Sequence, residues 1–154
     1  MNPSTGPVDV LVSRPKDGGL TWGSPVVVNN DGNFNDKNWS VCDDTASSPF
    51  FGNCYTEFDN ASGLNTVQMS TSTDGGASWS AAEQLAGPMT PTWLPLTDLG
   101  FMVGDYISTS IVPGDDDATP VFAVATAPFN RRQCLWNTAF DSERSINHRG
   151  RQAG

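Results

Sequence analysis

Two short segments bring together the residue types that most often bind ions or do chemistry in loops. They are 17-DGGLTW-22 and 72-STDGGASW-79, each with an aspartate, two glycines, a hydroxyl residue and a tryptophan. The aspartate can accept hydrogen bonds from backbone N–H groups just ahead of it, and the glycines permit the positive φ of a twisted hairpin turn. Every side chain of the pattern therefore has a structural task in a tight turn, and none is expected to be catalytic.

A tyrosine beside a carboxylate is a second pattern with chemical potential. Tyr55 and Glu57 lie two residues apart, so they share one face of a predicted strand. The alternative is a core tyrosine with a solvated glutamate. Asp105 and Tyr106 form a similar pair, for which the alternative is a turn aspartate followed by a strand aromatic. These four are the candidate catalytic residues, and the sequence assigns a role to none of them.

Metal-binding patterns are incomplete. The loop 31-DGNFND-36 begins like a calcium loop, but Asp36 replaces the required glycine and Cys42 stands where a bidentate glutamate is needed. The run 115-DDD-117 has no ligand spacing, and His148 is the single histidine, which argues against a zinc site or a Ser-His-Asp triad. We therefore predict no metal and no cofactor.

Composition and charge limit the classes of partner. The chain has 154 residues, enough for one domain, and 37% of them are hydrophobic. Its net charge of −9 argues against nucleic acid, which requires a basic face. No apolar run approaches the roughly 18 residues of a membrane helix. No signal peptide is visible, since the first residues lack a basic start followed by an apolar stretch.

Period-two alternation predicts strands on both sides of each DGG segment. Val8, Val10 and Val12 precede the first, and residues 66–71 alternate before the second. We therefore expect hairpins over 7–28 and 64–86, each with DGG at its turn. Further strands are predicted at 38–42, 53–58, 106–112 and 120–126, and no stretch has a helical period over three turns. The fold class is all-β.

The segment 72–79 resembles the Asp-box, S-x-D-x-G-x-S/T-W, also called the BNR repeat. The segment 17–22 is similar, with Pro15 where the motif has serine. The box residues are Asp17, Gly18, Gly19, Thr21, Trp22, Ser72, Asp74, Gly75, Gly76, Ser78 and Trp79. Asp-boxes occur in sialidases, in related exo-acting glycoside hydrolases and in non-enzymatic propellers. The resemblance implies a β-propeller with the box between the third and fourth strands of a blade.

A wider similarity covers most of residues 7–128. The stretches 36–59, 66–80, 101–112 and 120–128 look like the sialidase-like exo-α-sialidase family of bacterial secreted proteins. The family's propeller is typically six-bladed, and repeats of roughly 40–50 residues leave room here for about three blades. The resemblance therefore implies a partial or internally shortened propeller of antiparallel strands, an extracellular location and glycans as partners. Unclosed propeller edges imply self-association.

The same resemblance predicts a catalytically incomplete protein. Sialidases hold the substrate carboxylate with three arginines, whereas Arg14 is the only arginine within residues 1–130. One alternative is a non-catalytic propeller segment that binds glycan or protein. Trp39 and Trp93 would then stack on sugar rings, unless they belong to blade cores. Another alternative is a gene remnant without function.

The distribution of charge along the chain divides it into two parts. Residues 1–130 carry a net charge of −12 and residues 131–154 one of +3. We expect a propeller domain over 1–128 and a separate basic tail over 129–154, which is disordered, is a non-native end, or binds an acidic partner.

The cysteines bear on the cellular compartment. Cys42 and Cys54 flank a turn-rich loop and face each other if their strands pair, so a disulfide between them is predicted. Cys134 would then be the odd one out. A disulfide would suit an exported protein.

Overall fold

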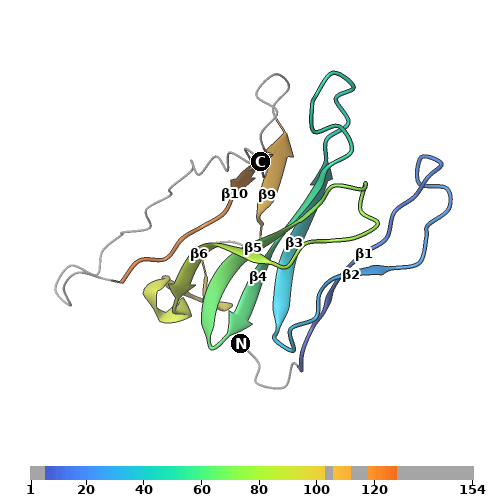
Figure 1. Ribbon diagram of the computed structural model, residues 1–154. Coiled ribbons are helices and arrows are strands. Elements are labelled where there is room, and N and C mark those ends of the chain that lie inside the picture. Colours follow the sequence, from blue (N-terminus) through green and yellow to red (C-terminus); the bar gives the residue numbers. More distant parts are fainter. Residues whose placement is uncertain (1–5, 103–105, 112–117, 128–154) are drawn as a thin grey trace, which may run out of the picture.

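The computed structural model describes residues 6–102, 106–111 and 118–127, which form antiparallel strands joined by turns (Figure 1). The all-β prediction is confirmed. Several residues named above lie outside the described part of the chain, and they are Asp105, residues 115–117, Cys134, His148 and the tail from 129 to 154. Within the described ranges, no helix is both long enough and apolar enough to span a membrane.

A four-stranded sheet forms the centre of the molecule. Its strands are β3 (Asn35–Cys42), β4 (Cys54–Ser62), β5 (Leu64–Ser72) and β6 (Glu83–Met89), and each pairs antiparallel with the next one along the chain. The tightest connection is the β4–β5 turn, where Gly63 has a φ of +94° that other residues rarely adopt. Successive antiparallel pairing makes this sheet a meander.

Smaller two-stranded sheets accompany the central one. β1 (Val10–Val12) pairs with β2 (Val26–Asn29), and β9 (Ser108–Ile111) pairs with β10 (Ala118–Val121). Between β6 and β9 the chain forms a 3-10 turn, η1 (Pro91–Trp93), and a short hairpin. That hairpin consists of β7 (Leu96–Thr97) and β8 (Gly100–Phe101). Among the described residues these sheets do not close into a barrel or a propeller.

The core lies on both faces of the central sheet. On one face Phe58 packs with Val10 and Val28 of the β1–β2 hairpin. On the other face Tyr55 and Met69 pack with Ala118 of β10. Because Tyr55 and Phe58 are three residues apart on β4, they point to opposite sides of the sheet. The three sheets are therefore stacked, with β1–β2 and β9–β10 on opposite sides of β3–β6 (Figure 1).

The predicted hairpins are present. β1 and β2 are joined by the loop that holds the first DGG, and β5 and β6 by the loop that holds the second. All four glycines have positive φ, at +71° and +92° for Gly18 and Gly19 and at +68° and +84° for Gly75 and Gly76. The strand predicted at 106–112 is shorter among the described residues, since β9 covers 108–111 and residue 112 lies outside them. The strand predicted at 120–126 was largely wrong, because β10 covers 118–121 and residues 122–127 are not in a strand.

Candidate functional site

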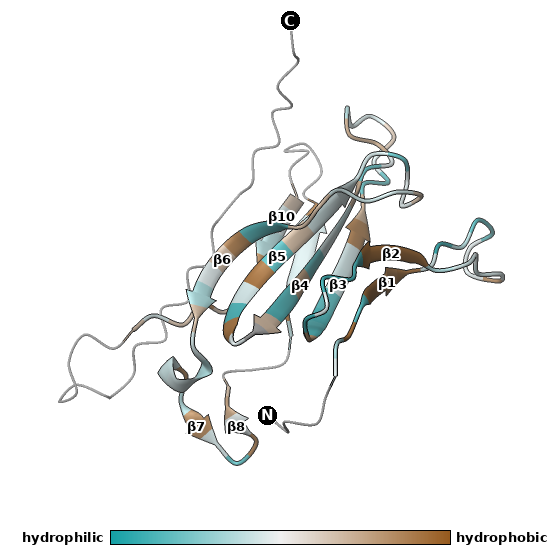
Figure 2. Cartoon of the chain, turned by 60° about the horizontal axis from the view of Figure 1, so that its bottom comes forward, coloured by the Kyte–Doolittle hydropathy of each residue, from teal (hydrophilic) through white to brown (hydrophobic). Residues whose placement is uncertain are grey.

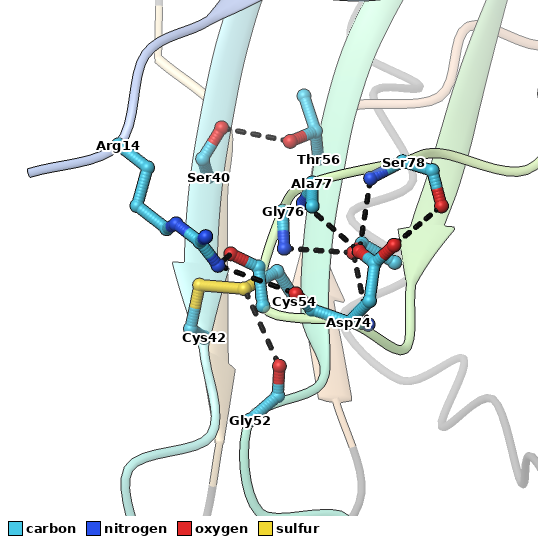
Figure 3. The surroundings of a disulfide bond; sticks show 12 residues. Arg14, Ser40, Cys42, Gly52, Cys54, Thr56, Asp74, Gly76, Ala77 and Ser78 are labelled. Carbon is cyan, nitrogen blue, oxygen red and sulfur yellow. Dashed lines mark hydrogen bonds between the residues drawn. A yellow bond between two sulfur atoms is a disulfide. The ribbon is translucent and has the colours of Figure 1, made fainter. Parts of the chain in front are cut away.

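The second DGG turn is organised around the carboxylate of Asp74 (Figure 3). Its Oδ1 accepts hydrogen bonds from the backbone N–H groups of Ala77 and Ser78, both at 2.9 Å. Its Oδ2 accepts a hydrogen bond from Ser78 Oγ at 2.6 Å. The chain folds this way because Gly75 and Gly76 turn it back on itself, which brings the following N–H groups over the carboxylate.

Ser72, the last residue of β5, also forms hydrogen bonds to this turn. Its Oγ donates to Asp74 Oδ1 at 2.7 Å and accepts from the N–H of Gly76 at 2.8 Å. Hydrogen bonds from the Ser78 side chain, the Ser78 backbone and the Ser72 side chain hold the pKa of Asp74 well below its usual range. A carboxylate so strongly kept in its charged form is a poor proton donor, so the arrangement suits a structural turn and not acid–base catalysis.

The first DGG turn has fewer of these contacts. Asp17 accepts hydrogen bonds from the backbone N–H of Thr21, at 2.9 Å, and from its hydroxyl group. These bonds, the side-chain one foremost, lower the pKa of Asp17. Pro15 offers no hydroxyl in the place of Ser72, and Trp22 is 65% exposed. By contrast, Trp79 of the second turn packs against the cluster of Val10, Val28 and Phe58.

Arg14 links the two turns. It precedes the first DGG and donates through one guanidinium nitrogen to the carbonyl oxygens of Asp74, at 3.2 Å, and of Gly75. The contact is close enough that a side chain at position 75 would meet the guanidinium, since a Cβ built there lies 2.6 Å from Arg14 Nη1. The guanidinium is therefore directed at backbone carbonyls of a structural turn.

A disulfide lies beside this contact. Cys42 and Cys54 are directly opposite each other in the β3–β4 pair, with their Cα atoms 4.0 Å apart, and their sulfur atoms are bonded at 2.05 Å. The predicted pairing is thus present in the structure. Figure 3 shows the disulfide, Arg14 and the Asp74 turn at the same end of the central sheet. The covalent bond joins the ends of the two strands at the point where the loop 43–53 leaves the sheet.

The Tyr55 and Glu57 pair faces the β9–β10 hairpin, not solvent. Both side chains are buried, and Glu57 is 0% exposed. Glu57 Oε2 accepts a hydrogen bond from Thr109 Oγ1 at 2.6 Å, while Glu57 Oε1 is buried without a hydrogen-bond partner. The expectation of a solvated glutamate was therefore wrong, because a strand distant in sequence covers this face. Tyr55 is a core tyrosine here.

Burial governs the chemistry of Glu57. Loss of solvation raises its pKa to about 7, the hydrogen bond from Thr109 opposes this rise, and the charge of Asp59 adds to it. A carboxyl with a pKa near 7 has the titration range of a general acid. However, the β9–β10 hairpin separates it from solvent, so no substrate can reach it in this conformation. Tyr106, the other described candidate, is 95% exposed.

An acidic neighbour of Glu57 was not predicted from the sequence. Asp59 lies two residues along β4 and directly opposite Asp36 on β3. Burial, and after it the charge of Asp36, raise the pKa of Asp59 to about 6, while the charge of Lys37 acts to lower it. Lys37 Nζ is 3.2 Å from Asp36 Oδ2. The only signal in the sequence is the i, i+2 spacing from Tyr55 through Glu57 to Asp59, which places all three on one strand face.

The calcium-like loop is a hydrogen-bonded turn. Asp31 accepts from the backbone N–H of Asn33 at 3.0 Å and from the side-chain amides of Asn33, Asn35 and Asn60. Partial burial opposes ionisation of Asp31, but these hydrogen bonds outweigh it and lower its pKa to about 2. The carboxylate oxygens of Asp31 are thus engaged in hydrogen bonds with amide N–H groups. Within residues 6–102, 106–111 and 118–127, no three acidic, histidine or cysteine residues are grouped so as to hold a metal ion.

The two candidate stacking residues are partly accessible. Trp39 on β3 is 48% exposed and Trp93 in η1 is 36% exposed. Neither belongs to the three clusters of buried core residues. Each therefore retains an exposed ring surface that a sugar or a protein surface can contact.

Comparison with known proteins finds no relative of this chain. No family model matches the chain, and no curated protein or solved structure matches it. The geometry of the two DGG turns, the disulfide and the buried carboxyls is therefore what bears on function.

Proposed function

We propose that the described residues are successive blades of an Asp-box propeller of the sialidase-like type. The observation that carries the proposal is the position of the second box. It lies between β5 and β6, which are the third and fourth strands of a four-stranded antiparallel meander. The first box joins β1 and β2, which pack face to face on that meander as an adjacent blade would. An extracellular location is part of the proposal, because the Cys42–Cys54 disulfide suits an oxidising compartment.

We further propose that this chain belongs by descent to proteins that act on glycans, but does not hydrolyse sialosides by itself. Stabilisation of the transition state requires a fixed positive clamp for the substrate carboxylate. Arg14, the only arginine within residues 1–130, donates to backbone carbonyls of the second box. Tyr55 and Glu57 are covered by another sheet. The described residues therefore offer no arginine clamp, and of the two candidate tyrosines only Tyr106 is exposed.

The test is release of a fluorescent aglycone from a synthetic α-sialoside by the purified chain. We expect turnover far below the range of about 1 per second and above that is usual for enzymes. Tyr55→Phe and Tyr106→Phe serve as matched controls that keep ring size and remove the hydroxyl. Turnover above about 1 per second that is abolished in one of these variants would contradict the proposal and identify the nucleophile.

Self-association is a consequence of the same proposal. Leu11 and Val27 lie opposite each other on the β1–β2 hairpin, on the face away from the core, and each is 49% exposed. In Figure 2, β1 and β2 are coloured as hydrophobic along nearly their whole length. Adjacent apolar side chains exposed on a sheet face favour association between chains.

Light scattering coupled to size-exclusion chromatography tests this consequence. We expect an apparent mass that rises with protein concentration in the wild type. The double variant Leu11→Thr/Val27→Thr keeps strand propensity and removes apolar surface, so it should shift the chain toward monomer. A wild-type chain that is monomeric at all concentrations would show that these edges do not self-associate.

A further inference from the structure

Glu57 lies where two sheets meet. Its side chain leaves β4 and points at β9, where Thr109 donates a hydrogen bond to Oε2 at 2.6 Å. Its other oxygen is enclosed without a partner. On the same face of the sheet, Tyr55, Met69, Ala118 and Ile111 form an apolar cluster that joins the central sheet to the β9–β10 hairpin. Such a site tolerates a neutral carboxyl far better than a charged one, because no donor compensates the second oxygen.

We propose that protonation of Glu57 holds the β9–β10 hairpin against the β3–β6 sheet, and that release of this proton to solvent lets the hairpin separate. The pH would then determine whether the β9–β10 hairpin covers this face of the central sheet (closed) or leaves it exposed (open). The proposal does not depend on the propeller assignment, because it rests only on the enclosed carboxyl and its neighbours.

Charged groups near Glu57 come from two strands of its own sheet. Asp59 on β4 lies on the same face, with Asp36 and Lys37 of β3 beside it. On β5 the residue opposite Glu57 is Met69, and the described residues of β9 and β10 carry no charge. A charged Glu57 would therefore meet like charge from Asp59, and Lys37 is engaged with Asp36.

The direction of the pH effect follows from the pKa in the two states. Glu57 has an ordinary pKa of 4.5 when exposed and one of about 7 in the closed state. The closed state therefore binds the proton more tightly, so raising the pH from below 5 to above 7 favours opening. Asp59, with a pKa of about 6 in the folded protein, acts in the same direction.

Hydrogen exchange of backbone amides in the 154-residue chain tests the proposal. After correction for intrinsic exchange, the opening constant for amides of β9 and β10 should rise by at least about 50-fold between pH 5 and pH 8. In Glu57→Gln, which is neutral and nearly isosteric, the rise should be at most about 10-fold, the remainder coming from Asp59. Asp59→Asn is the matched control, and it should still show a rise on the order of 50-fold, which is the part that Glu57 supplies.

The β1–β2 amides give an internal reference, because that hairpin packs on the opposite face of the sheet. An equal rise there would overturn a hairpin-specific effect, as would an unchanged rise in Glu57→Gln. If Glu57→Gln does not fold, the carboxyl carbon of Glu57 in the wild type can be titrated by NMR. A midpoint near 7 supports the proposal, and a midpoint near the ordinary 4.5 overturns it.

Discussion

The two DGG turns share their central residues and differ in what surrounds them. In the second turn, the Ser72 hydroxyl connects Asp74 to the N–H of Gly76, and the Asp74 carboxylate receives hydrogen bonds from Ser72, Ala77 and Ser78. In the first turn, Pro15 has no hydroxyl, and Asp17 accepts its side-chain and backbone hydrogen bonds from Thr21. The comparison shows that the central residues suffice to make the turn, whereas the flanking serine adds hydrogen bonds to the aspartate and to the second glycine.

The tryptophans of the two turns differ even more, in how far each is covered by neighbouring side chains. Trp79 is packed against side chains of the β1–β2 hairpin and of β4, so it lies in the contact between two sheets. Trp22 is 65% exposed, and among the described residues no sheet covers it. The same sequence position is therefore partly buried against the core in one turn and exposed in the other. Its contribution depends on a neighbouring sheet and not on the turn.

Replacing the tryptophans should give the largest difference between the turns. Trp79→Ala removes a ring from the cluster with Val10, Val28 and Phe58 and should lower the free energy of unfolding by about 2–4 kcal/mol. Trp22→Ala, the matched control, should change it by no more than about 0.5 kcal/mol. Chemical denaturation of both variants measures this. Equal effects would mean that Trp22 is covered in solution, for example by a second chain.

Breaking the polar contacts should give the next largest difference. Ser72 is almost fully buried, so Ser72→Ala leaves the Gly76 N–H without its acceptor and should cost about 1–3 kcal/mol. Asp74→Ala should lower the thermal midpoint by more than Asp17→Ala, because Asp74 accepts more hydrogen bonds. Thermal unfolding followed by circular dichroism gives the order, and a larger effect of Asp17→Ala would contradict it.

The Asp74 effect should also depend on pH in a known direction. Hydrogen bonds lower the pKa of Asp74 below its ordinary 3.8, so its contribution is fully present above that pH and is lost as the pH falls further. The difference in thermal midpoint between the wild type and Asp74→Ala should therefore be constant at neutral pH and become smaller in strong acid. If this difference already became smaller between pH 5 and pH 7, a titratable group other than Asp74 would be responsible for the pH dependence.

Restoring the missing serine should give the smallest effect. Pro15→Ser supplies the first turn with the hydroxyl that Ser72 gives the second, which should add at most about 1 kcal/mol. Loss of the proline's restriction on the unfolded chain offsets part of this gain. Chemical denaturation is again the measurement, with Pro15→Ala as the control that loses the ring without gaining a hydroxyl. If serine is no better than alanine, the first turn lacks the geometry to use it.

The residues of both turns were predictable because their interactions are local. Asp74 binds groups within four residues along the chain, and Gly75 and Gly76 need only their own backbone angles. The Cys42–Cys54 pair was predictable for a related reason, since strands on either side of one turn-rich loop tend to pair. Alternation over residues 66–71 likewise predicted β5, because one face of a half-buried strand must be apolar.

The roles of Arg14 and Glu57 were decided by the tertiary structure. Arg14 meets Asp74 across a separation of 60 residues, and Thr109 meets Glu57 across 52. Nothing in the neighbouring residues of Glu57 distinguishes a solvated glutamate from an enclosed one, because strand alternation specifies a face but not what covers it. The sequence by itself thus determined the all-β class, the turns and the disulfide. The stacking of sheets decided which side chains are buried, and hence the charge state of Glu57 and the partner of Arg14.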